Sequence, residues 1–171
     1  MRVGLLPVGP VPPRLLDELS RSLVAYHLEL HTLSQEAIPD EVFDPRRRKH
    51  RAEGFLRRQW GNADETFLAV TTVDLFTEGL DFVFGLADVS GGRAVVSVRR
   101  LADSDPDVVS ARLLKECVHE LGHTWGHQHC DDSACVMHFS NSIEETDAKS
   151  ARFCETCARS LPEGIVSPPS P

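Results

Sequence analysis

A run of regularly spaced histidines constrains this chain more than any other feature of its sequence. His119, His123 and His129 occur with Glu120 and Gly126 in the order His-Glu-x-x-His-x-x-Gly-x-x-His. Residues four apart lie on one face of a helix, so the first two histidines can reach the same metal ion. A glycine can adopt positive φ, which ends the helix and turns the chain back, so that the third histidine supplies another ligand. Three histidines leave a fourth position open for water, as in catalytic zinc sites.

Glu120 follows the first histidine of this motif directly. On a helix its carboxylate lies beside the expected ion rather than on it, where it can hold a water molecule and act as a general base. The alternative is that the histidines are ordinary core or surface residues of a helix. A chance match to all five fixed letters is expected in only about one chain in 20,000 of this length, which disfavours that alternative.

The cysteines are concentrated in the last third of the chain. Cys130, Cys135, Cys154 and Cys157 form a C-x4-C pair and a C-x2-C pair, and Cys117 stands apart from them. An odd number of cysteines argues against a framework of disulfides, and the spacing of these four fits a structural zinc site. Two disulfides or reduced core thiols remain the alternatives. We expect Cys117 to pack in the core.

These motifs resemble those of the metzincin clan of zinc peptidases, and in particular those of the archaemetzincins, which combine the histidine motif with a four-cysteine zinc site. The specific resemblance covers residues 116–157. It implies two zinc ions per chain: a catalytic ion held by His119, His123 and His129, and a structural ion held by the four cysteines. It also implies that Met137 lies in a tight turn beneath the catalytic zinc.

The activity implied by the resemblance is hydrolysis of a peptide bond by a zinc-activated water, with Glu120 as general base and a peptide or protein as substrate. In the related enzymes the substrate lies along the edge strand of the sheet, which would be 93–99 here. Some metzincins place a tyrosine just after the methionine of the turn, whereas none follows Met137 and the only tyrosine is Tyr26. A hydrolase of non-peptide amides, or a zinc-loaded peptide-binding or regulatory module with little turnover, therefore remains an alternative.

The order of the expected elements predicts a mixed α/β (α+β) fold. Strands are expected at 2–8, 28–33, 66–73, 82–87 and 94–98, and helices at 14–27, 44–60, 106–125 and 156–161. Strands that alternate with helices predict a mainly parallel twisted sheet, and a hairpin adds one antiparallel edge strand. Together with the resemblance, this order implies a metzincin-like zincin fold with an active-site helix and a small C-terminal subdomain clipped by zinc.

A length of 171 residues suits a single domain. We expect that domain to cover 1–161, with an N-terminal subdomain at 1–129 that holds the sheet and the active-site helix. A C-terminal subdomain at 130–161 would hold the methionine turn and the four cysteines. The tail, 162–171, contains four prolines and two serines and is expected to be disordered. Within the motif, we expect His127 to be exposed near the cleft.

The charge of the chain limits its partners. It has 26 acidic against 18 basic residues, a net charge of −8, which disfavours binding to nucleic acid. A basic run over 46–58 is expected to be the solvated face of a helix, and a patch for an acidic partner is the alternative. No apolar run approaches the roughly 20 residues that span a bilayer, and the first residues lack the features of a signal peptide. We therefore expect a cytoplasmic protein without a membrane partner.

Overall fold

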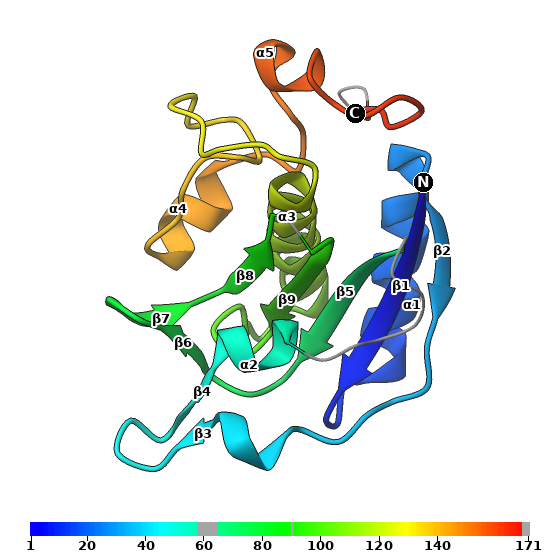
Figure 1. Cartoon of the computed structure of the whole chain (residues 1–171). Coiled ribbons are helices and arrows are strands. Elements are labelled where there is room, and N and C mark those ends of the chain that lie inside the picture. Colours follow the sequence, from blue (N-terminus) through cyan, green and yellow to red (C-terminus); the bar gives the residue numbers. More distant parts are fainter. Residues whose placement is uncertain (58–64, 90, 169–171) are drawn as a thin grey trace.

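A five-stranded sheet forms the centre of the molecule (Figure 1). The computed structural model describes residues 1–57, 65–89 and 91–168. In spatial order, the sheet consists of β2 (Glu29–Thr32), β1 (Arg2–Val8), β5 (Thr66–Thr71), β9 (Arg93–Ser97) and β8 (Gly85–Asp88). The first four strands run parallel, and β8 pairs antiparallel with β9 at the edge. The expectation of a mainly parallel sheet with one antiparallel edge strand is confirmed.

Helices cover both faces of this sheet, because its central strands are apolar on both sides. Leu5 of β1 belongs to a buried cluster that includes residues of α1 (Pro13–Leu23) and α3 (Pro106–Thr124). Its neighbour Leu6 points the other way, into a cluster with residues of α2 (Ala52–Leu56). The helices α1 and α3 therefore lie on one face and α2 lies on the other (Figure 1).

The long helix α3 is followed by a glycine turn, as expected, and it begins at a cap. The Asp105 carboxylate accepts a hydrogen bond from the N–H of Asp107 at 2.9 Å, and Pro106 occupies the first turn. The helix ends at Thr124, and Gly126 has a φ of 90°. Since glycine adopts this conformation readily, the chain can leave the helix axis at this point.

A small four-stranded sheet takes in the first part, 44–51, of the basic helix that was expected at 44–60. It is formed, in spatial order, by β3 (Phe43–Asp44), β4 (Lys49–Arg51), β6 (Leu75–Thr77) and β7 (Leu80–Val83). The Asp44 carboxylate accepts hydrogen bonds from the N–H groups of Arg46 at 2.8 Å and Arg47 at 3.1 Å, and Arg48 has a φ of 56°. The helix prediction was wrong for 44–51 because Asp44 and Pro45 start a turn. Only α2 is helical, and the expected end near residue 60 lies outside the described residues.

The basic side chains of this hairpin contact the small sheet. The guanidinium groups of Arg47 and Arg51 lie over the ring of Phe76, at 4.9 and 5.1 Å from its centroid. Lys49 Nζ lies 2.8 Å from the Asp81 carboxylate. These contacts leave Arg46, Arg47, Arg48 and Arg51 exposed, so the basic face is solvated as expected, but it lies on a hairpin and not on a helix.

Two further elements differ from the expected boundaries. The helix expected at 14–27 ends at Leu23 and is followed by the short helix η1 (Val24–Tyr26), after which His27 has a φ of 60°. The strand expected at 82–87 divides at Phe84, because β7 belongs to the small sheet whereas β8 belongs to the large one. A second short helix, η2 (Asp40–Val42), precedes β3.

The C-terminal third contains a helix that was not expected, α4 (Ile143–Ala148), in addition to α5 (Glu155–Ala158). Ser142 Oγ accepts a hydrogen bond from the N–H of Glu145 at 3.3 Å, and the Glu145 carboxylate accepts one from the N–H of Asn141 at 2.5 Å. This arrangement is close to a capping box, whose Ser-x-x-Glu pattern is visible in the sequence.

The expected disordered tail does not begin at 162. Ile165 is buried in the main core, and the N–H of Val166 donates to the carbonyl of Tyr26 at 3.3 Å. Ser167 Oγ accepts from the N–H of Phe153 at 3.1 Å. The chain is therefore packed up to 168, and 169–171 lie outside the described residues. Within the described part of the chain, no helix is long and apolar enough to cross a membrane.

Candidate metal centres

The three histidines of the motif converge on one point. His123 Nε2 lies 3.1 Å from His119 Nε2 and 3.2 Å from His129 Nε2. In a tetrahedral zinc site with Zn–N distances of about 2.05 Å, ligand nitrogens are roughly 3.3 Å apart. The three nitrogens therefore fit the ligand geometry of zinc. Helix α3 supplies the first two histidines from successive turns, and the turn at Gly126 brings the third one back.

The second ring nitrogen of each helical histidine is held by a backbone carbonyl. His119 Nδ1 donates to the carbonyl of Val136 and His123 Nδ1 donates to the carbonyl of His127, both at 2.8 Å. These bonds place the proton on Nδ1 and leave Nε2 as the lone pair that faces the other histidines. Burial lowers the pKa of all three imidazoles, most strongly that of His119. The neutral form that binds metal is therefore the favoured form.

Glu120 lies beside this cluster and is buried. Burial raises the pKa of its carboxyl well above the usual range, the nearby Glu116 carboxylate acts in the same direction, and the Lys149 ammonium opposes them. A carboxylate with a raised pKa is a stronger base than an ordinary one, which suits a general base. Its side chain lies against Gly85, the first residue of β8.

A cleft opens in front of Glu120 and His119. Its walls come from β7, the start of β8, the C-terminal half of α3 and the segment after Met137. The residues that line it are Leu80, Asp81, Phe82, Val83, Phe84, Gly85, Glu116, His119, Glu120, Phe139, Ser140 and Asn141. An extended chain in this cleft would contact an apolar wall on one side and the carboxylate of Glu120 on the other.

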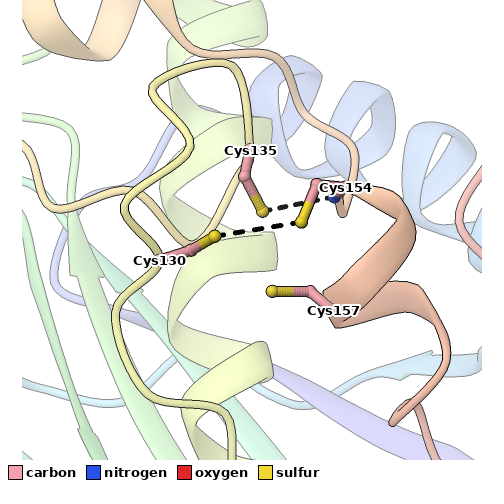
Figure 2. A group of neighbouring side chains, drawn as sticks. All are labelled: Cys130, Cys135, Cys154 and Cys157. Carbon is pink, nitrogen blue, oxygen red and sulfur yellow. Dashed lines mark hydrogen bonds between the residues drawn. The ribbon is translucent and has the colours of Figure 1, made fainter.

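The four clustered cysteines form the second centre. Figure 2 shows their sulfurs pointing toward one another, with Cys130 and Cys135 from the loop after α3 and with Cys154 and Cys157 at α5. The four sulfurs lie within 4.8 Å of one another, and the Sγ atoms of Cys130 and Cys154 are 3.8 Å apart. Tetrahedral zinc with Zn–S distances of about 2.3 Å separates its sulfurs by roughly 3.8 Å, whereas a disulfide brings them to about 2.05 Å. The cysteines are unpaired and fit a metal site.

Two further residues singled out in the sequence, Cys117 and Met137, lie in the main core. Cys117 is fully buried in the main core and takes no part in the cysteine cluster. Met137 is fully buried, and a Cβ atom on Gly122 would overlap its Sδ. Gly122 lies on α3 directly before His123, so Met137 packs against α3 next to this histidine.

Two expectations about the site were wrong. The segment 93–99 is not an edge strand, because β9 lies between β5 and β8, and β8 forms the edge beside the cleft. His127 is buried rather than exposed, because its ring packs on Phe153 and its Nε2 donates to the carbonyl of Cys157 at 2.9 Å.

Sequence reasoning also missed three residues that surround Glu120. Gly85 provides the space for its side chain. Glu116, one helical turn earlier on α3, forms a buried ion pair with Lys149 at 3.0 Å. The spacing of four between the two glutamates was a visible signal for Glu116. Nothing local marked Gly85 or Lys149, because both come from other elements.

Comparisons with known proteins agree with this geometry. The model of peptidase family M54 matches residues 59–163. The archaemetzincin of Haloquadratum walsbyi is 38% identical over 94% of this chain and 99% of its own length. The crystal structure of archaemetzincin from Archaeoglobus fulgidus, complexed with malonate, has a TM-score of 0.88 at 33% identity and covers 94% of this chain and 100% of its own. That from Methanopyrus kandleri has a TM-score of 0.84 at 36% identity, with 92% and 91% covered. This chain belongs to peptidase family M54, the archaemetzincins, and is a zinc metallopeptidase.

Proposed function

We propose that this chain hydrolyses peptide bonds at a zinc site formed by His119, His123 and His129, with Glu120 as general base. The observation that carries the proposal is the convergence of three Nε2 atoms, at 3.1 and 3.2 Å, next to a buried carboxylate in a cleft. When bound, zinc polarises the scissile carbonyl and lowers the pKa of water to about 7. Membership in a peptidase family supports a peptide substrate over a non-peptide amide or a binding role.

The role of Glu120 is to move a proton. Its carboxylate accepts a proton from the attacking water while the new C–O bond forms at the carbonyl carbon. As the C–N bond breaks, the same group donates the proton to the leaving amine. The contact with Gly85 holds the side chain in place for both steps, and burial, which raises the pKa of the carboxyl group, makes the carboxylate a stronger proton acceptor for the first step.

The substrate is proposed to bind along β8. This strand pairs with β9 on one side, and its other side borders the cleft that contains Glu120. An extended peptide can add to such an edge through main-chain hydrogen bonds. Phe82, Phe84 and Phe139 then offer apolar contacts to its side chains.

We propose that Cys130, Cys135, Cys154 and Cys157 hold a second, structural zinc. This ion would connect α5 with the loop that follows α3. Cys130 in that loop and Cys154 at α5 are 24 residues apart in the sequence. Four thiolates fill the tetrahedral positions, so the ion has no open position for substrate. The division into 1–129 and 130–161 follows, since the second segment would be clipped by this ion.

The proposed mechanism is tested with Glu120→Gln. A diverse peptide mixture is incubated with each protein and the products are read by mass spectrometry, with zinc content measured in parallel. Loss of a general base typically lowers the rate by about 100- to 10,000-fold, and we expect that loss with the zinc content unchanged. Cleavage by Glu120→Gln at the rate of the unmodified protein would contradict the role of Glu120.

A further inference from the structure

One residue, His127, touches both proposed metal centres. Its carbonyl accepts a hydrogen bond from His123 Nδ1 at 2.8 Å. Its ring Nε2 donates to the carbonyl of Cys157 at 2.9 Å. A proposed ligand of the histidine site and a proposed ligand of the cysteine site are therefore joined through one intervening residue.

His127 is held firmly between the two centres. It is 7% exposed, and its N–H donates to the carbonyl of Gly122 at 3.0 Å. Its ring centroid lies 5.3 Å from that of Phe153. Since the carbonyl of Cys157 can only accept, Nε2 carries the ring proton in this arrangement. A shift of the cysteine site would thus be transmitted to the carbonyl that orients His123.

The carbonyl of Cys157 does not need the hydrogen bond from the His127 ring to be satisfied. That oxygen also accepts from the N–H of Ser160 at 3.1 Å and from Ser160 Oγ at 3.0 Å. An apolar side chain at 127 could pack on Phe153 equally well. What a histidine adds at this position is a hydrogen bond that fixes the orientation of residue 127, and with it the carbonyl that faces His123.

The other two histidines are also tied to the cysteine site, but through the backbone. His119 Nδ1 donates to the carbonyl of Val136, which directly follows Cys135. His129 directly precedes Cys130. Of the three connections, the one through His127 uses the side chain of a residue that is not itself a proposed ligand, so a substitution can remove it while all the proposed ligands remain.

We propose that His127 is a positioning residue that couples the two metal centres. With the cysteine site loaded, its ring holds its carbonyl against His123, so that His123 presents Nε2 to the catalytic zinc and binds it more tightly. This proposal rests on the proposed function, because it assumes that both sites hold zinc. Removing a partner that orients a metal-bound histidine typically lowers metal affinity by about 10- to 100-fold.

Two substitutions separate the hydrogen bond from the packing. His127→Phe keeps an aromatic ring against Phe153 and removes the donor, whereas His127→Gln keeps an N–H donor at the same reach and removes the ring. The affinity of the histidine site is measured by competition with a chelator, in protein whose cysteine site is loaded. We expect about a 10- to 100-fold loss in His127→Phe and near-normal affinity in His127→Gln. Equal affinity of His127→Phe and the unmodified protein would overturn the proposal, as would equal losses in both variants.

A measurement on the unmodified protein provides a second test that needs no substitution. Both sites are loaded with cobalt, whose thiolate charge-transfer band reports the cysteine site and whose d–d bands report the histidine site. We expect the histidine site to lose cobalt at lower chelator concentrations once the cysteine site is empty. If the histidine site lost cobalt at the same chelator concentration whether the cysteine site was loaded or empty, the coupling would be overturned. The metal content of the unmodified protein distinguishes this failure from failure of the two-site proposal, which predicts about two zinc ions per chain.

Discussion

Gly85 lies directly against the side chain of Glu120. A Cβ atom at Gly85 would come within 2.6 Å of Glu120 Cγ, 2.7 Å of Glu120 Oε1 and 2.8 Å of the carbonyl oxygen of Val95. Carbon atoms do not approach other atoms so closely, so either the carboxylate or the strand pair β8–β9 would have to shift. The first residue of the edge strand therefore fixes the position of the proposed general base.

We predict that Gly85→Ala lowers peptidase activity while zinc binding remains. Displacement of a catalytic group by about 1 Å can lower the rate by about 100-fold, and the expected loss of kcat/KM is about 10- to 100-fold. The control is Ala87→Gly, which removes one methyl group from the same strand at a position that does not line the cleft beside Glu120. Normal kcat/KM in Gly85→Ala, with normal zinc content, would contradict the positioning role of Gly85.

A second close contact joins Gly122 to Met137. A Cβ atom on Gly122 would overlap Met137 Sδ and would lie 3.3 Å from Phe153 Cε1. We predict that Gly122→Ala destabilises the zinc-loaded protein by about 1–3 kcal/mol, because both neighbours are buried in a packed core. Denaturant unfolding at a fixed zinc concentration measures this change.

The partner substitution shows whether this loss comes from the methionine. In a Met137→Ala background the overlap with Sδ is relieved, so Gly122→Ala should destabilise by less than it does alone. An equal effect in both backgrounds would mean that Met137 is not the neighbour that excludes a larger side chain at position 122.

Much of the candidate site could be predicted because its residues are close in sequence. The ligands of the first centre fall within eleven residues, from His119 to His129, and helical periodicity with one glycine turn relates them. The caps of α3 and the apolar runs of β1 and β5 are likewise local signals. Local sequence patterns were therefore enough to predict the histidine cluster, helix α3 and the strands β1 and β5.

The features that could not be predicted depend on contacts between distant segments. Which strand of the hairpin lies at the edge of the sheet is decided by β5, which pairs with β9 and leaves β8 outside. His127 is buried because Phe153 and Cys157 fold over it, and the spacing of the motif contains no sign of them. The basic run was misread because Asp44 can cap either a turn or a helix, and the local sequence did not distinguish the two.

The buried ion pair between Glu116 and Lys149 gives a third prediction. Their side chains are 4% and 0% exposed, and Lys149 also donates to the carbonyl of His138 at 3.3 Å. Lys149→Met would leave the Glu116 carboxylate buried with Thr146 Oγ1 as its remaining side-chain donor. Removing one partner of a buried pair typically destabilises by about 3–5 kcal/mol, and we expect a loss in this range in denaturant unfolding.

The matched control removes both charges. Glu116→Gln combined with Lys149→Met leaves no uncompensated buried charge, so the double variant should recover most of the stability that Lys149→Met loses. If the double variant were no more stable than Lys149→Met, the loss would stem from the packing of the lysine side chain rather than from the unpaired buried charge of Glu116.

The four-cysteine centre gives the last prediction, which concerns metal content. Protein purified without added metal should contain about two zinc ions per chain, and Cys154→Ser should retain about one, because three thiolates hold a tetrahedral ion less tightly than four. The variant should also be less stable, since a structural zinc contributes its binding free energy to folding. Elemental analysis and thermal unfolding measure the two effects. Cys117→Ala is the matched control, because Cys117 is buried outside the cluster and should leave the zinc content unchanged. One zinc ion per chain in the unmodified protein would show that the four cysteines pack as reduced thiols, with the metal confined to the histidine site.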